Sequence, residues 1–185
     1  MNTHMIFNFI GFQVCWAACV WGGAQGYWWL GPAAVALFAA WELSRSAGVV
    51  LDLKLLSAVL VFGVILDTLY VQLGLLRYAT PLPSQQIAPV WIWSMWIAFA
   101  LTLNHSMAWL KSNMLLATVF GAIGGPFAYW VAAKAWDAVF IDSERTVMAY
   151  GIIAIAWAIA CPVLLKIAAA LDSKSDQLNA PVVAS

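Results

Sequence analysis

Charged residues are scarce in this sequence of 185 residues, of which only 9% are Asp, Glu, Lys or Arg. A soluble domain carries about 25% charged residues, so the chain lacks the polar surface that keeps a globular protein in water. Its eight basic residues balance its eight acidic residues, and no basic field is available to attract a nucleic acid. The composition therefore excludes a soluble domain, a disordered protein and a nucleic-acid-binding protein.

The familiar signatures of catalytic and cofactor sites are also absent. The sequence contains no phosphate-binding loop, no Gly-x-Ser-x-Gly nucleophile motif and no dinucleotide fingerprint. Its only histidines, His4 and His105, do not form the paired motifs of membrane hydrolases and desaturases. Cys15, Cys19 and Cys161 lie inside expected helices, where a thiol behaves as a small hydrophobic group. We accordingly expect no metal ion and no cofactor, and the sequence leaves enzymatic activity undecided.

Hydrophobic residues, by contrast, make up 65% of the chain and are grouped in long runs with almost no charge. A helix needs about 20 apolar residues to cross the hydrocarbon core of a membrane, whereas a transmembrane barrel has short alternating segments. The runs therefore predict an all-α, polytopic membrane protein, a bundle of six transmembrane helices. The expected helices cover residues 5–24, 28–45, 53–76, 88–110, 112–133 and 146–168.

Glycine and proline mark several boundaries between these helices. The Gly-Gly-Ala-Gln-Gly stretch at 22–26 supplies a turn, because glycine tolerates the backbone angles of a reversal. Pro81, Pro83 and Pro89 interrupt the long apolar run that follows the third helix. The membrane domain is expected to span residues 1–171. Residues 172–185 are polar and are expected to form a short disordered cytoplasmic tail.

The positive charges predict the orientation of the chain. Six helices place both termini on one side of the membrane, and five basic residues fall on that side against three on the other. This excess favours termini in the cytoplasm. The five residues are Arg45, Lys54, Lys111, Lys166 and Lys174, and the three are Arg77, Lys134 and Arg145.

Tryptophan is abundant, with twelve residues, and most of them fall at expected helix ends. This distribution is typical of the aromatic belts at the two surfaces of a membrane. Trp16, Trp96 and Trp157 lie within expected helices, and a belt does not explain them.

Polar side chains within the expected helices form two layers, of which the inner one lies towards the cytoplasm. A charge at membrane depth costs roughly 2.5–3.5 kcal/mol on insertion scales, so such a side chain faces protein or water. Hydrogen bonding between helices and a site for a substrate, a lipid headgroup or a proton are both open explanations of this layer. The inner layer comprises Asn8, Gln13, Glu42, Asn104 and His105.

The outer layer contains a carboxyl group within a strongly apolar run. Asp67 lies thirteen residues after Lys54, which places it about 20 Å from the inner end of its helix. A lone carboxylate at this depth needs a cation, a proton or a water-filled cavity, and structural and functional roles are both open. Arg77 and Lys134 are expected to extend towards the membrane surface. The outer layer comprises Asp67, Gln72, Arg77, Tyr129 and Lys134.

Small residues four positions apart occur in the fifth expected helix. Gly121 and Gly125 lie on one face, and Pro126 follows them. Small residues let neighbouring helices approach closely, so we expect this face to pack tightly within the bundle.

Several of these elements together resemble an uncharacterised family of small bacterial inner-membrane proteins that contain a domain of unknown function. The resemblance covers roughly residues 6 to 168. It implies a bacterial inner (plasma) membrane location, and family members are often encoded near cyclopropane-fatty-acid-synthase-like genes. It assigns no catalytic residue. The elements are Asn8-x-x-x-x-Gln13, Leu66-Asp67-Thr68, Gly74-Leu75-Leu76-Arg77, the segment 102–109 (Thr-Leu-Asn-His-Ser-Met-Ala-Trp) and the segment 121–126 (Gly-Ala-Ile-Gly-Gly-Pro).

Three functional hypotheses follow. The first is an accessory or enzyme component of membrane-lipid modification, with membrane lipids and a lipid-modifying enzyme as partners. In it His105 transfers a proton, Asn104 and Gln13 orient the substrate, and Glu42 is the carboxylate partner. The second is a small-molecule carrier or the substrate-binding membrane subunit of a transporter, with Asp67 at an occluded site. The third is a structural packing partner, and the sequence leaves a homo-oligomer open.

Overall fold

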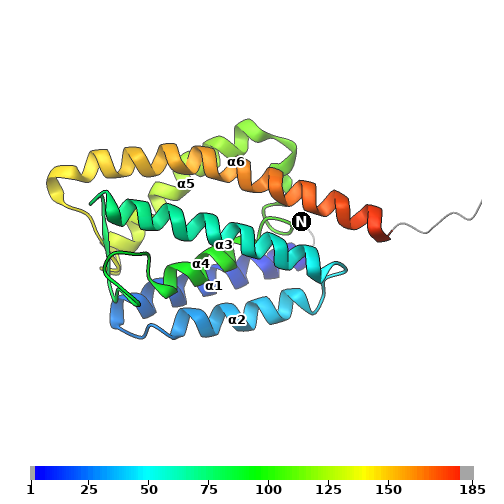
Figure 1. The fold of residues 1–185 in the computed structure, drawn as a ribbon, viewed down its shortest axis with the longest axis horizontal. Coiled ribbons are helices and arrows are strands. Elements are labelled where there is room, and N and C mark those ends of the chain that lie inside the picture. The colour runs from blue at the N-terminus through cyan, green and yellow to red at the C-terminus, as the bar shows by residue number, and fades with distance from the viewer. Residues whose placement is uncertain (1–2, 180–185) are drawn as a thin grey trace, which may run out of the picture.

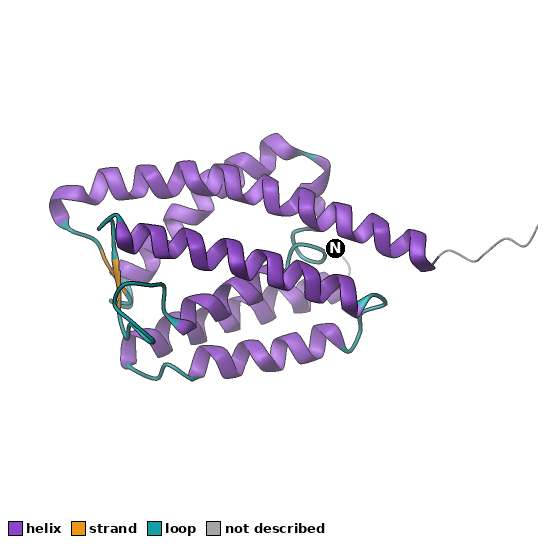
Figure 2. Ribbon diagram, viewed as in Figure 1, coloured by secondary structure: helices purple, strands orange, loops and turns teal. Residues whose placement is uncertain are grey.

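The computed structural model describes residues 3–179 of the chain, which are mainly α-helical (Figures 1 and 2). The helices run back and forth along the long axis of the molecule, as the colours in Figure 1 show. The six α-helices of this region are α1 (Thr3–Gln25), α2 (Leu30–Leu43), α3 (Val49–Gln72), α4 (Val90–Ala100), α5 (Met114–Lys134) and α6 (Thr146–Asn179). The shorter elements are the 3-10 helices η1 (Ala108–Ser112) and η2 (Ser143–Arg145) and the strands β1 (Arg77–Tyr78) and β2 (Val139–Phe140).

Four of these helices are long and apolar enough to cross a membrane, which indicates a membrane protein. They are α1, α3, α5 and α6, the last together with the short turn before it. Helices α2 and α4 are also apolar but have only 14 and 11 residues. At about 1.5 Å per residue, α4 is only about 16 Å long, so it does not span the hydrocarbon core by itself.

Helix α4 is shorter than expected because polar groups interrupt it. The sequence predicts one helix over 88–110, but α4 ends at Ala100 and residues 101–107 form turns before η1. The Leu101 carbonyl accepts a hydrogen bond from the Asn8 side chain, and the Thr102 hydroxyl donates to the Phe99 carbonyl. Such side-chain bonds compete with the helical backbone ladder.

Other boundaries differ from the expected ones at the ends of the chain and in the first connection. Helix α1 continues through the glycines at 22 and 23, and the turn occurs at Gly26, whose φ is +82°. Helix α6 extends to Asn179, so part of the expected polar tail is helical. The remainder of that tail, residues 180–185, lies outside the described residues.

Helix α4 occupies the centre of one group of helices and contacts α1, α2 and α3. Its Trp96 packs against Gly63 of α3, where an added Cβ would lie 2.0 Å from the indole ring. Trp96 also stacks on Trp157 of α6, with ring centroids 5.0 Å apart and ring planes 13° apart. These two tryptophans therefore join the central helix to α6 in the core.

Helices α5 and α6 have the most extensive contact of any two elements in the described part of the chain, and the tight packing expected of the small-residue face occurs there. A Cβ at Gly121 would lie 2.2 Å from the Trp157 carbonyl oxygen, and one at Gly125 would lie 2.3 Å from the Trp157 ring. Only glycine permits this approach of the two helices. Strands β1 and β2 pair antiparallel at the opposite end from His4, Arg77 with Phe140 and Tyr78 with Val139.

Candidate functional site

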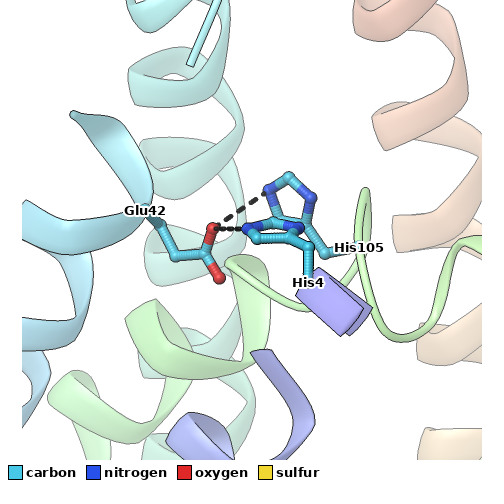
Figure 3. A group of neighbouring side chains, drawn as sticks. All are labelled: His4, Glu42 and His105. Atoms are coloured by element: carbon cyan, nitrogen blue, oxygen red, sulfur yellow. Dashed lines mark ion pairs between the residues drawn. The ribbon is translucent and has the colours of Figure 1, made fainter. Parts of the chain in front are cut away.

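Three side chains from separate parts of the chain meet at one end of the bundle (Figure 3). His4 lies in the first turn of α1, and Glu42 lies in the last turn of α2. The antiparallel packing of α1 and α2 brings these turns together. His105 joins them from the turns that follow α4. The break in the fourth expected helix therefore positions one of the two histidines.

Both imidazoles point at the same carboxylate oxygen. The Nε2 atom of His4 lies 3.2 Å from Glu42 Oε2, and the Nε2 atom of His105 lies 3.6 Å from it. The histidine rings meet edge to face, with centroids 4.9 Å apart. Glu42 is 3% exposed. Burial lowers the pKa of His105, although the Glu42 charge opposes this shift, so the neutral imidazole is favoured there.

Asn8 holds the other oxygen of Glu42 in place. The Asn8 side chain is fully buried, and its Nδ2 donates to Glu42 Oε1 and, at 3.0 Å, to the Leu101 carbonyl. Its Oδ1 accepts from the backbone amide of Ser106 at 3.2 Å and from the Ser106 hydroxyl at 2.6 Å. A side-chain amide has two donors and two acceptor sites, and Asn8 uses them all. This network connects Glu42 to the turns that carry His105.

A polar cavity of about 230 Å³ adjoins the three residues. Its walls include Asn104 and three charged residues, Arg45, Asp52 and Asp172. Lys111 contacts two of these wall residues, since its Nζ donates to Asn104 Oδ1 at 2.7 Å and pairs with Asp172 at 3.1 Å. The cavity can admit water and a small polar group next to Glu42.

An apolar groove lies beyond Asn8 and Ser106, between α1, α5 and α6. Its volume is about 490 Å³, within the range of ligand pockets. Its few polar groups include Gln13, Thr102 and Ser106. The apolar and small lining residues include Phe9, Phe12, Trp16, Phe120, Gly124 and Trp157.

Asp67 forms a second buried polar cluster, deep within the helices. Its Oδ1 accepts hydrogen bonds from the Tyr78 and Tyr129 hydroxyls, and its Oδ2 accepts from Trp96 Nε1 at 2.5 Å. Burial and the nearby Asp67 charge raise the pKa of Tyr78, so its hydroxyl stays protonated and can donate. The three donors come from β1, α4 and α5, so Asp67 connects four elements.

The structure brings together only part of each expected polar layer. Of the inner layer, Asn8, Glu42 and His105 meet, and Asn104 lines the adjoining cavity, whereas Gln13 is exposed along the groove. Of the outer layer, Tyr129 contacts Asp67. The other members, Gln72, Arg77 and Lys134, are exposed, and no hydrogen bond or ion pair joins them to Asp67 within the described part of the chain.

A comparison with family models places the chain among known sequences. Residues 5–163 match the model of a protein of unknown function, DUF2878. The chain belongs to the DUF2878 family. The DUF2878 match includes Glu42, Asp67 and His105, whereas His4 lies just before it. No curated protein and no solved structure matches the chain.

Sequence reasoning missed four residues of these clusters in this DUF2878 protein: His4, Trp96, Tyr78 and Ser106. His4 does lie four residues before Asn8, which places both on one face of a helix. Trp96 is one of the three tryptophans that an aromatic belt leaves unexplained. No comparable signal in the sequence identifies Tyr78 or Ser106, because their contacts come from residues far away in the chain.

Proposed function

We propose that this protein is a multi-pass protein of a bacterial inner membrane that binds a membrane lipid and acts in membrane-lipid modification. The apolar groove between α1, α5 and α6 carries the proposal. These three helices are among the four that are long and apolar enough to cross a membrane. A groove between such helices faces the hydrocarbon of the bilayer, so an acyl chain is its natural occupant.

The position of the polar groups supports a lipid with its headgroup towards the His4 end of the bundle. Ser106 lines the groove and also donates to Asn8, which holds Glu42. The end of the groove at Ser106 is therefore one side chain away from the polar cavity at His105. Along α5 the groove extends from Phe120 to Val131, a distance of about 16 Å at the helical rise. This length suits a substantial part of one acyl chain.

We further propose that the six helices cross the membrane, with both termini of the chain in the cytoplasm. The direction of the helices alternates, so the start of α1 and the end of α6 lie at the same end of the molecule (Figure 1). Short helices α2 and α4 cross the bilayer with the help of their flanking segments, shielded by their neighbours. The excess of basic residues at the end that carries Arg45 and Lys111 supports its cytoplasmic location.

The carrier hypothesis has less support. The cavity that reaches Asp67 has a volume of only about 80 Å³. The Asp67 oxygens are already occupied by three hydrogen-bond donors. We therefore do not propose a transported substrate at Asp67.

Photolabelling of the groove tests lipid binding. We would reconstitute the full chain in vesicles that contain a phospholipid with a photoreactive acyl chain and map the labelled peptides by mass spectrometry. A Gly124→Leu variant should fill the groove, because an added Cβ there meets nothing closer than 3.8 Å. We expect labelling of α1 and α5 in the wild type and a reduction of about tenfold in the variant.

Gly151→Leu is the matched control, because Gly151 is exposed on α6 and no atom lies within 4 Å of an added Cβ. Equal labelling of the groove in wild type and Gly124→Leu would overturn the lipid site, as would protein–protein cross-links from a second copy in its place.

Lipid modification is tested by the acyl-chain composition of a bacterial strain that lacks the gene. An unchanged composition would contradict that part of the proposal.

A further inference from the structure

We propose that His4, Glu42 and His105 form a binding site for a divalent transition-metal ion such as Zn²⁺, Fe²⁺ or Co²⁺. The three side chains converge from α1, α2 and the turns after α4, and their ligand atoms lie within 4.8 Å of one another (Figure 3). Two imidazole nitrogens and one carboxylate oxygen are a recurrent ligand set for zinc and for non-haem iron. This inference is independent of lipid binding in the groove.

The distances fit a metal better than a pair of hydrogen bonds. Metal bonds of about 2.0–2.1 Å to nitrogen and oxygen place neighbouring ligand atoms of a tetrahedral site about 3.3 Å apart. The Glu42 Oε2 atom lies 3.2 Å from His4 Nε2 and 3.6 Å from His105 Nε2. The second distance is too long for a good hydrogen bond. All three ligand atoms lie within 4.8 Å of one another, so binding of one ion would draw the two imidazoles together.

The surroundings of the carboxylate resemble the outer shell of a metal site. Glu42 is almost fully buried, and among the described residues its Oε2 faces the two imidazoles and accepts no hydrogen bond from any other group. Its Oε1, in contrast, is held by Asn8. One oxygen is thus fixed while the other faces the two histidines. Hydrogen bonds to the second oxygen of a ligating carboxylate orient it and tune its affinity for the metal.

The adjoining cavity leaves room for a further ligand. Its 230 Å³ of space next to the three residues can hold water or an anionic oxygen in an open coordination position. Zinc sites that have three protein ligands and one open position are catalytic rather than structural. Glu42, Asp52 and Asp172 line the cavity, and the basic groups near them are Arg45 in its wall and Lys111, which pairs with Asp172, so acidic groups outnumber basic ones by three to two. This balance favours the entry of a cation.

Metal uptake by the purified chain tests the site directly. The full chain would be purified in detergent through a tag without histidine, treated with a chelator and titrated with Co²⁺, whose visible spectrum reports its ligands. We expect one Co²⁺ per chain, displaced by an equivalent of Zn²⁺. His4→Gln and His105→Gln should each weaken Co²⁺ binding by at least tenfold, and Asn8→Ala by about 10- to 100-fold.

Glu144→Gln is the matched control, because Glu144 is exposed in η2 at the opposite end of the bundle. It should bind Co²⁺ as the wild type does. Size-exclusion elution and tryptophan fluorescence in detergent would show that each variant is folded. Glu42→Gln is expected to abolish Co²⁺ binding. Because Glu42 is buried, loss of binding in that variant does not separate a lost ligand from a disturbed fold, so the decisive variants are those of the partly exposed histidines.

Two outcomes would overturn the proposal. One is a folded wild-type chain that takes up no more Co²⁺ than a folded His4→Gln/His105→Gln double variant, which would leave only the direct contacts between Glu42 and the two imidazoles. The other is undiminished affinity in His4→Gln and His105→Gln. Neither outcome depends on photolabelling of the groove, so failure of the metal site and failure of the lipid site are distinguishable.

Discussion

Tyr129 of α5 and Tyr78 of β1 donate hydrogen bonds to the same oxygen of Asp67, Oδ1. With the indole of Trp96 on Oδ2, the buried carboxyl group has three donors and no cation among its hydrogen-bond partners in the described part of the chain. A carboxylate offers about four acceptor positions, so a single group can accept from all three donors. Asp67 thus joins the α5–α6 pair to the central helix α4 through neutral donors.

The Asp67→Asn variant is expected to be less stable by roughly 2 kcal/mol, because asparagine has a single acceptor oxygen and its NH2 group cannot accept from the donor on the other side, while the remaining bonds lose their charge assistance. Thermal unfolding in detergent would measure the loss. Asp137→Asn is the control, since Asp137 is exposed and has a φ of 53°, which asparagine tolerates. Unchanged stability of Asp67→Asn would show instead that the wild-type carboxyl group is protonated, because asparagine has the shape of the neutral acid.

Tyr129→Phe is expected to lower stability by about 1.5–3 kcal/mol, because it removes a donor from a buried charged acceptor. Combined with Tyr78→Phe, the loss should exceed the sum of the two single losses, since Oδ1 is then left without a donor. Thermal unfolding of the wild type, the two single variants and the double variant gives the coupling free energy between the two tyrosines. Tyr27→Phe, at an exposed tyrosine, serves as the control. Strict additivity would contradict a shared acceptor.

Gly121→Ala is expected to destabilise the protein by about 1–3 kcal/mol, because its Cβ would overlap the Trp157 carbonyl and force α5 and α6 apart. Gly124→Ala on the same helix meets nothing closer than 3.8 Å. It should gain up to about 1 kcal/mol from the higher helix propensity of alanine. Thermal unfolding of both variants in detergent measures the difference. Equal stabilities would be inconsistent with the α5–α6 contact.

The proposed orientation predicts which connections an impermeant thiol reagent can reach in intact cells. Single cysteines at Gln85 and Ser143 should react, because both positions are exposed at the end opposite His4. A cysteine at Ala47, exposed near the polar cavity, should react only after the cells are lysed. The native cysteines at 15, 19 and 161 are buried and provide the background. The reverse pattern would place the termini outside.

The long apolar runs were sufficient to predict the helices, because a stretch of about 20 uncharged residues has few alternatives to helical structure in a membrane. The glycine face at 121 and 125 likewise predicted the tight packing of α5. These features are local, since each depends on residues within a few turns of one another. The scarcity of charged residues is a property of composition alone, and it indicates a membrane protein without any knowledge of the fold.

The break in the fourth helix could not be predicted in this way. The residues just after Ala100 include no proline, glycine or charged residue that would mark a helix end, and the group that bonds to the Leu101 carbonyl is Asn8, which is distant in sequence. The Asp67 cluster depends similarly on β1 and α5, which the chain reaches only after long connections. Hydropathy along the sequence contains no information about such pairings.

The sequence by itself predicted a helical membrane protein with six transmembrane helices, of which the structure has four long and apolar enough to cross a membrane. It also identified Glu42, Asp67 and His105 as polar residues that need partners. Only the tertiary structure decided which partners they have. His4 meets Glu42 because α1 and α2 pack antiparallel, and His105 joins them because α4 ends early. A buried polar group must be satisfied by whatever side chain the packing brings to it, and packing is a property of the whole fold.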